Sequence, residues 1–305
     1  MAVALSCVCH FGIWSFCRQP RRTFVHHIEV HTLKPYHFFQ TILFCLFCGH
    51  LIAQQDSTRR DSAHILFSIP VQATFVTADH LSNTYLVKAD NSVEKYDSTG
   101  RRVARYSNNR LGGVAFADVT NPLKILLWYA DFQTIVTLDR TLNEIGQLNL
   151  NDVNLPTVKS IGQAQDGNIW IYDDAGFRLM KITPAGEVVL ESQPLNLVFP
   201  DRLTATCIRD NGEMVFVSDP QQGISAFDQY GYLLRTYPDL KATVFEVLRE
   251  WLVIPEKNTL RYEHLSRFQT LRIALPVNGG RFWTGNNRVF IQSEQGVQVF
   301  GINKA

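Results

Sequence analysis

One phrase recurs along the chain from residue 85 onward. It consists of an apolar strand, an acidic residue, a few polar residues and a second strand that ends on an apolar or aromatic residue. These end residues are Tyr96, Leu138, Ile182, Phe227, Tyr262 and Phe300. Their successive spacings are 42, 44, 45, 35 and 38 residues. Repetition of strands at this period is typical of a β-propeller, in which each repeat forms one four-stranded blade.

Residue alternation supports the assignment of strands. Ser92–Tyr96 and Gln295–Val299 place polar and apolar side chains on opposite faces, as a strand requires. Turn residues separate the strands, for example at Asp97–Gly100 and Asp228–Gly231. From residue 54 onward no stretch shows a sustained helical period. We therefore predict an all-β fold.

Six copies predict six blades, and the two ends of the chain indicate how the ring closes. The last copy stops at residue 305, directly after its third strand. His64–Ile69 is a strand without a blade of its own, and it can supply the missing fourth strand. We predict a six-bladed β-propeller over residues 63–305, closed by this N-terminal strand, with counts of five or seven blades still open. The expected blades cover about 70–107, 108–151, 152–196, 197–240, 241–276, and 277–305 with 63–69.

The first 53 residues differ in composition from the rest. They hold five of the six cysteines and six of the nine histidines, but not at the spacing of a zinc finger or zinc ribbon. Residues 38–53 form an apolar run after Lys34 and end in a small-residue cleavage site, as in a secretory signal peptide. We predict an N-terminal extension plus signal peptide over 1–53, with the true start near residue 33, and a short linker over 54–62.

Export to the periplasm, the cell surface or the medium follows from that leader. Four of the 29 Lys/Arg and one of the 28 Asp/Glu lie in it, which leaves 25 basic and 27 acidic residues. This near-neutral balance argues against a nucleic-acid partner. No stretch after the leader is long and apolar enough to span a membrane. Cys207 is the one cysteine outside the leader, and we interpret it as a buried small hydrophobe.

The repeat resembles that of NHL-type propellers, a module related in architecture to WD-repeat propellers. A blade of that family reads apolar strand, Val-Ala-Asp, a strand ending in Phe-Asp, and a glycine three residues further on. Lys88–Asp90 with Tyr96–Gly100 matches this pattern, and so does Val217–Asp219 with Phe227–Gly231. The fifth repeat departs from it, with Glu256 in place of the first aspartate. The resemblance implies a fold and a binding role, and it carries no catalytic motif.

An acidic residue follows the first strand of each phrase. Equivalent turns of a propeller lie on one face, so these carboxylates would form a ring. They are Asp90, Asp131, Asp173, Asp219, Glu256 and Glu294. One interpretation is a docking face or a site for a hard cation. The favoured interpretation is a turn in which each carboxylate accepts backbone N–H groups, because one carboxylate per blade does not converge on a point. The repeat does not explain Asp174.

Motifs of catalysis are missing from the sequence. It contains no nucleophile elbow, HExxH helix, P-loop or dinucleotide-binding glycine motif. Six-bladed enzymes that resemble gluconolactonase hold a divalent ion in the central channel, and lyase-like relatives use histidines. Only His64, His80 and His264 follow the leader, in different blades. We predict no catalytic residue, metal ligand or cofactor. A lactonase-like hydrolase or lyase with Ca²⁺ in the channel is the alternative.

Two apolar features bear on the partner. Trp128, Trp170 and Trp251 occur at an equivalent phase of their strands, which favours packing between blades over a carbohydrate- or peptide-binding cluster. The connection Leu195–Phe199 is apolar, either as a partner surface or as buried packing. Rigid blades with variable loops suit recognition. We predict an exported, non-catalytic binding module for another envelope or secreted protein, with carbohydrate as a second ligand class.

Overall fold

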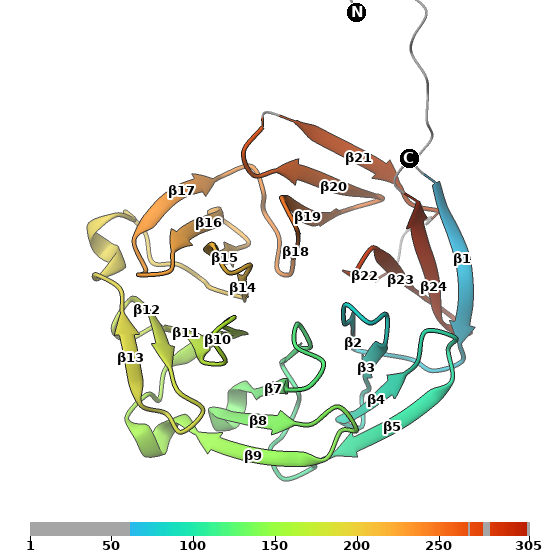
Figure 1. Cartoon of the computed structure of the whole chain (residues 1–305), viewed down its shortest axis with the longest axis horizontal. Coiled ribbons are helices and arrows are strands. Elements are labelled where there is room, and N and C mark those ends of the chain that lie inside the picture. The colour runs from blue at the N-terminus through green and yellow to red at the C-terminus, as the bar shows by residue number, and fades with distance from the viewer. Residues whose placement is uncertain (1–61, 268, 277–280, 304–305) are drawn as a thin grey trace, which may run out of the picture. The chain divides into compact units, whose positions relative to one another are not determined.

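The computed structural model describes residues 62–267, 269–276 and 281–303. Within these ranges the chain forms 24 strands and three short 3₁₀ helices. The strands build six four-stranded antiparallel sheets, arranged as blades around a central axis (Figure 1). The prediction of an all-β, six-bladed propeller is confirmed. The predicted leader over 1–53 lies outside the described residues, as does the linker up to residue 61.

Each blade runs from an inner strand at the axis to an outer strand at the rim. Blade 1 consists of β2 (Phe75–Ala78), β3 (Thr84–Val87), β4 (Ser92–Tyr96) and β5 (Arg102–Ser107). Blade 2 consists of β6 (Phe116–Asp118), β7 (Ile125–Tyr129), β8 (Thr134–Leu138) and β9 (Glu144–Asn149). Blade 3 consists of β10 (Val158–Gln163), β11 (Ile169–Asp173), β12 (Arg178–Ile182) and β13 (Val188–Glu191).

The other three blades follow the same order. Blade 4 consists of β14 (Cys207–Asp210), β15 (Met214–Asp219), β16 (Gly223–Asp228) and β17 (Leu233–Tyr237). Blade 5 consists of β18 (Glu246–Leu248), β19 (Trp251–Glu256), β20 (Thr259–His264) and β21 (Thr270–Ala274). Blade 6 consists of β22 (Phe282–Gly285), β23 (Arg288–Ser293), β24 (Gly296–Asn303) and β1 (Ser62–Ile69). The short helices are η1 (Ala130–Phe132), η2 (Leu150–Val153) and η3 (Leu195–Leu197).

Blade 6 takes its outer strand from the start of the described chain (Figure 1). β1 pairs antiparallel with β24 along its whole length, with one bulge near its middle. The predicted closure by an N-terminal strand is therefore confirmed. Gly296 is required here, because its φ is +129° and a Cβ would lie 2.2 Å from the carbonyl oxygen of Ile69.

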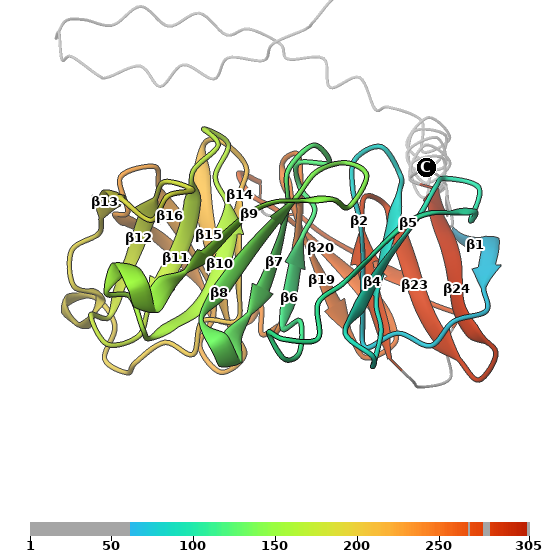
Figure 2. The same cartoon turned by 90° about the horizontal axis from the view of Figure 1, so that it is seen from below.

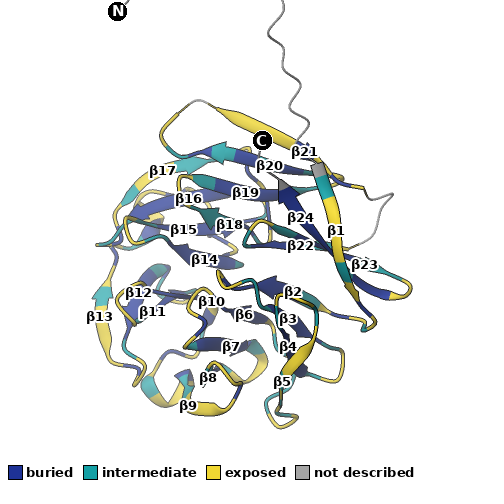
Figure 3. Cartoon of the chain, turned by 45° about the vertical axis from the view of Figure 1, so that its right-hand side comes forward, coloured by how far each residue is buried: buried dark blue, intermediate teal, exposed yellow. Residues whose placement is uncertain are grey.

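Packing between neighbouring blades forms the core. Blades 3 and 4, for example, meet through the buried side chains of Trp170, Tyr172, Ile208 and Val217. Because both faces of a sheet are covered by its neighbours, the second strands are continuous apolar runs, and all five residues of β7 are buried. The outer strands are largely exposed, as Figure 3 shows along the rim.

Antiparallel pairing places the turns on two faces of the ring (Figure 2). The connection face carries the turns between the second and third strands of every blade and the connections from one blade to the next. The opposite face carries the remaining turns. Each inner strand therefore begins at the connection face and ends at the opposite face. In the part of the chain described above, no helix is long and apolar enough to cross a membrane.

Candidate functional site in the central channel

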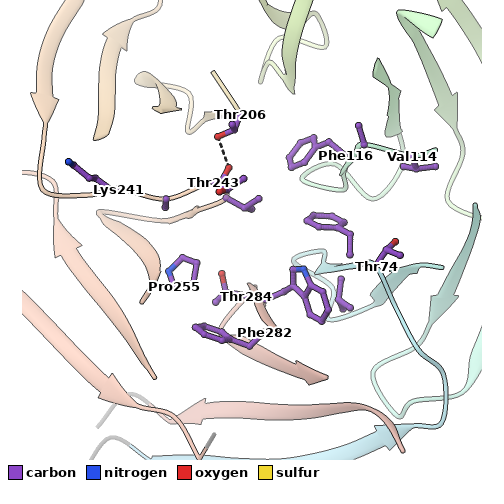
Figure 4. A pocket seen from close by; sticks show the side chains of 15 residues that line it. Thr74, Val114, Phe116, Thr206, Lys241, Thr243, Pro255, Phe282 and Thr284 are labelled. Carbon is purple, nitrogen blue, oxygen red and sulfur yellow. Dashed lines mark hydrogen bonds between the residues drawn. The ribbon is translucent and has the colours of Figure 1, made fainter. Parts of the chain in front are cut away.

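The inner strands surround a channel, and its end at the connection face is hollowed into a cavity of about 580 Å³ (Figure 4). We call this cavity the apolar chamber. Its walls come from the beginnings of β2, β6 and β22 and from the segments that lead into β14 and β18. The residues that line it include Thr74, Phe75, Phe116, Thr206, Phe282 and Trp283. The volume is within the range of cavities that bind small ligands.

Aromatic rings make up much of the wall of the apolar chamber. The rings of Phe75 and Phe116 contact each other at a tilt, with centroids 5.7 Å apart, and Phe282 and Trp283 are half-buried. Lys241 is the one charged residue among the described residues of the lining, and its amine points away from the rings (Figure 4). The chamber therefore presents aromatic rings beside polar groups of the threonines, with its one charged amine turned away from the rings.

Two of the four threonine hydroxyls in the wall donate hydrogen bonds within the protein. Thr206 Oγ1 donates to the carbonyl oxygen of Thr243 at 2.8 Å (Figure 4). Thr74 Oγ1 donates to the carbonyl oxygen of Val87 at 3.1 Å. Each hydroxyl has one proton, so these two can still accept hydrogen bonds but have no proton left to donate.

Arg209 crosses the channel deeper in. It extends from β14 in blade 4, and its Nη1 lies 3.3 Å from Asp118 Oδ2 at the end of β6 in blade 2. Its Nη2 lies 3.1 Å from Glu246 Oε1 on β18 in blade 5. The guanidinium carbon is 5.0 Å from the centre of the Phe116 ring. The Arg209 side chain is 6% exposed and that of Asp118 is 1% exposed, so the bridge is almost free of water.

Burial and the neighbouring acidic groups have opposite effects on the pKa of Arg209. Burial disfavours the charge of Arg209, but the neighbouring Cys207, Glu246 and Asp118 raise its pKa above that of an ordinary arginine, so it stays protonated. Burial raises the pKa of Glu246, against the opposing effect of Arg209. Removal of one partner would leave a buried charge unpaired, which is strongly destabilising. The bridge is therefore a fixed part of the channel.

A second cavity of about 100 Å³ lies at the end of the channel on the opposite face. We call it the polar chamber, because Asp79, His80, Arg209 and Glu246 all line it. Arg209 lines this chamber, while Phe116, on which Arg209 stacks, lines the apolar chamber. Arg209 and Phe116 therefore lie where the two chambers adjoin.

All six acidic residues singled out from the sequence lie at turns between second and third strands, on the connection face. Three of them accept backbone N–H groups within their own turns. Asp90 Oδ1 accepts from Ser92 N–H at 3.1 Å, and Asp173 Oδ2 accepts from Gly176 N–H at 2.8 Å. Asp219 is buried, and its Oδ1 accepts from the Gln221 N–H at 2.6 Å. These contacts hold the turns in shape.

The other three members of the acidic set differ from one another. Glu256 pairs with Arg261 and Arg272, at 3.8 and 3.4 Å. Asp131 in η1 and Glu294 are exposed. That the six acidic residues form a binding ring for a cation or a partner remains a prediction.

The three histidines among the described residues lie far from one another in the topology. His64 is on the outer strand β1, and His80 follows β2 and lines the polar chamber. His264 ends β20, where its ring centroid is 4.7 Å from that of Trp251 and its Nε2 is 3.2 Å from Glu250 Oε2. Among the described residues no three His, Cys, Asp or Glu side chains are grouped so as to hold a metal ion.

Sequence reasoning missed the residues that shape the channel. Arg209 is 91 positions from Asp118 and 37 from Glu246, and the repeat does not connect them. The sequence did contain one signal of the inner strands. Asp79, Asp118 and Asp210 stand at the ends of inner strands, and each accepts the backbone N–H two residues further on. This second series of aspartates marks the inner strands, one strand earlier than the predicted ring.

The three tryptophans stand at different distances from the starts of their strands, and each packs in a cluster that includes residues of the following blade. Trp128 is the fourth residue of β7, Trp170 the second of β11 and Trp251 the first of β19. The expected packing between blades is confirmed for Trp128 and Trp170, which are buried in two different clusters. Trp283 instead lines the apolar chamber.

The apolar connection between blades 3 and 4 was predicted to be either a partner surface or buried packing, and it is partly exposed and partly buried. Leu195 and Phe199 are buried, whereas Leu197 in the middle of the segment is 70% exposed. The connection also explains Asp174, whose Oδ1 lies 3.6 Å from Nη1 of Arg202. That ion pair joins the turn of blade 3 to the connection that follows it.

Fold and channel together define a six-bladed β-propeller with a chamber partly lined by aromatic rings on one face. No family model matches the chain, and no curated protein sequence matches it. Solved structures that are similar include a streptogramin B lyase (15% identity, TM-score 0.52, 80% of this chain and 88% of that chain). The β-propeller domain of Myceliophteria thermophila Cps50 (Swd1) has 10% identity and a TM-score of 0.56, covering 79% and 100%. BBS1N, solved in complex with ARL6DN, has 13% identity and a TM-score of 0.51, covering 81% and 98%. These likenesses show the fold alone.

Proposed function

We propose that this protein is a binding module that takes an uncharged apolar side chain of a partner protein into the apolar chamber. The observation that carries the proposal is the chamber itself, a cavity of about 580 Å³ with aromatic walls at the end of the channel. An apolar anchor inserted into a desolvated pocket is the usual energetic centre of a protein interface. Burial of one side chain of the size of Leu or Phe contributes about 1.5–3 kcal/mol.

The connection face offers further apolar contacts to such a partner. Phe132 in η1 is 49% exposed and Leu197 in η3 is 70% exposed, both on the face at which the chamber lies. We further propose, from the predicted leader, that the partner is another envelope or secreted protein. The similar solved propellers include a lyase and a domain solved in complex with ARL6DN, so these likenesses favour neither an enzyme nor a binding module. The choice between the two therefore rests on the residues of the channel.

The alternative is a hydrolase or lyase with Ca²⁺ in the channel. Such an ion requires several carboxylate oxygens that are free to bind it. Asp118 and Glu246 are the carboxylates that meet across the channel, and the guanidinium of Arg209 already binds both. A fixed organic cation thus stands where the ion would be held, which favours the binding module.

Selection of displayed peptides on the full chain tests the proposal. We expect the selected peptides to share an apolar residue flanked by uncharged ones. Phe282→Ser, which removes a ring from the chamber wall, should weaken their binding about tenfold or more, equivalent to ~1.4 kcal/mol. Leu271→Ser is the matched control, since Leu271 lies on the outer strand β21 and is 38% exposed. It should leave binding unchanged.

Two results would contradict the binding module. One is an equal loss of peptide binding in Phe282→Ser and Leu271→Ser. The other is lactone hydrolysis by the full chain that depends on added Ca²⁺ and is lost in Phe282→Ser.

A further inference from the structure

We propose that Arg209 sets the depth of the apolar chamber, and thereby the length of the apolar group that the propeller accepts. The inference rests on the proposed function above. It makes Arg209 a positioning residue for specificity, because it acts through Phe116 and not by contact with the partner.

The two chambers are consecutive stretches of one channel. On β2, Thr74, Phe75 and Val76 line the apolar chamber, and the next residue, Thr77, lines the polar one. The same change occurs at the end of β22, where Thr284 lines the first chamber and Asn286, just past the strand, lines the second. The lining thus passes from one chamber to the other within one or two residues of the backbone. What ends the apolar chamber must therefore be a side chain that projects across the channel.

Arg209 is that side chain. It spans from β14 in blade 4 to Asp118 in blade 2, with the Phe116 ring stacked against its guanidinium. It is held at both sides, since Asp118 and Glu246 take separate Nη groups. If the guanidinium swung away, it would leave two buried carboxylates unpaired, so a ligand cannot push it aside cheaply. The floor of the apolar chamber is therefore rigid.

A rigid floor has a measurable consequence for linear ligands. Each methylene of an alkyl chain that enters the chamber should tighten binding about fourfold. Once the chain end reaches Phe116, further methylenes stay in water and affinity stops rising. The chain length at which this happens measures the depth of the chamber.

The experiment is titration calorimetry of the full chain with straight-chain primary alcohols of increasing length. In the native protein we expect affinity to rise with length and then to stop. Arg209→Ala combined with Asp118→Asn and Glu246→Gln removes the divider without leaving a buried charge. In this triple variant the rise should continue for several more methylenes. Arg209→Met with the same two amides is the matched control, because it keeps most of the side-chain volume, and its limit should stay close to the native one.

A second measurement needs no variant. Diols with a hydroxyl at each end must bury one hydroxyl against Phe116 when the floor is closed, so at every length they should bind the native protein much more weakly than the alcohols. Long diols that bind as tightly as alcohols would show an open channel and overturn the inference. An unchanged length limit in the Arg209→Ala triple variant would also overturn it. If alcohols of every length fail to bind the native protein, the proposed function falls as well.

Discussion

Asp210, at the end of inner strand β14, shows how single polar residues join the blades. Its Oδ2 accepts a hydrogen bond from Trp170 Nε1 of blade 3 at 2.9 Å. Asp118 of blade 2 makes the corresponding link from the other side, since its Oδ2 accepts from the backbone N–H of Gln163 in blade 3 at 3.0 Å. Both carboxylates are buried. Such bonds matter most through the cost of leaving one partner buried and unsatisfied.

A matched pair of tryptophans isolates this effect. Trp170 and Trp128 are both buried, but Trp128 Nε1 has no hydrogen-bond acceptor among the described residues. Replacement of either by Phe removes similar volume, and only Trp170→Phe removes a hydrogen bond to the buried Asp210 carboxylate, whose Oδ2 then keeps the longer contact with the Gln165 N–H at 3.3 Å. We expect Trp170→Phe to lower the free energy of unfolding by about 1–3 kcal/mol more than Trp128→Phe. Urea unfolding curves of the two variants measure the difference, and equal losses would count against this role of Asp210.

Aspartates at the turns between third and fourth strands predict a response to acid. Hydrogen bonds, the strongest from Thr99, lower the pKa of Asp97 from 3.8 to about 2. Thr141 has the same effect on Asp139, again to about 2. Because the folded-state pKa is lowered, this stabilisation is complete above the unfolded value of 3.8 and is lost as the pH falls through about 2.

The double variant Asp97→Asn with Asp139→Asn tests the pH dependence. It should unfold at a lower temperature than the native protein at neutral pH, and the two melting curves should converge as the pH approaches 2. Glu213→Gln, which removes an exposed charge elsewhere, is the control. A constant difference in melting temperature between native protein and double variant at every pH would refute the assignment.

At the scale of elements, the ring depends on how β1 and β24 meet. The alternating pattern of the last strand and the unassigned strand near residue 64 predicted this pairing, and the structure has it. The close approach at Gly296 could not be read from the pattern, because it depends on where the Ile69 carbonyl lies in space. The same holds for η3, where the start of the predicted apolar connection forms one helical turn in which Leu195 is buried.

Gly296→Ala tests the closure. The new Cβ would need to displace the Ile69 carbonyl, and alanine is strained at a φ of +129°. We expect a loss of about 2 kcal/mol or more in the free energy of unfolding. Faster hydrogen exchange should be concentrated in β1 and β24. Gly113→Ala is the control, since the nearest atom to its Cβ would be 3.7 Å away. Exchange rates in β1 and β24 that match those of the control would show that the closure tolerates a side chain.

At the scale of the whole molecule, the fold was predictable because every blade repeats the same apolar second strand and turn. The residues that bridge the channel were not predictable, because they are not part of the repeat. Arg209, Asp118 and Glu246 stand in three different blades, and no other blade repeats their bridge within the described residues. Pattern recognition detects what blades share, whereas a site at the axis is built from what distinguishes them. The acidic ring could be found in the sequence because each of its members belongs to one copy of the repeat.

We propose that the channel mouth receives an uncharged apolar group. The most direct test is ¹⁹F NMR of the full chain labelled with 5-fluorotryptophan, titrated with 1-octanol. Trp283 lines the chamber, while Trp170 is buried between blades 3 and 4 and away from it. We predict a saturable shift of the Trp283 resonance, assigned with Trp283→Phe, and no shift for Trp170. A Trp283 resonance that stays in place, or equal shifts of both resonances, would contradict the account.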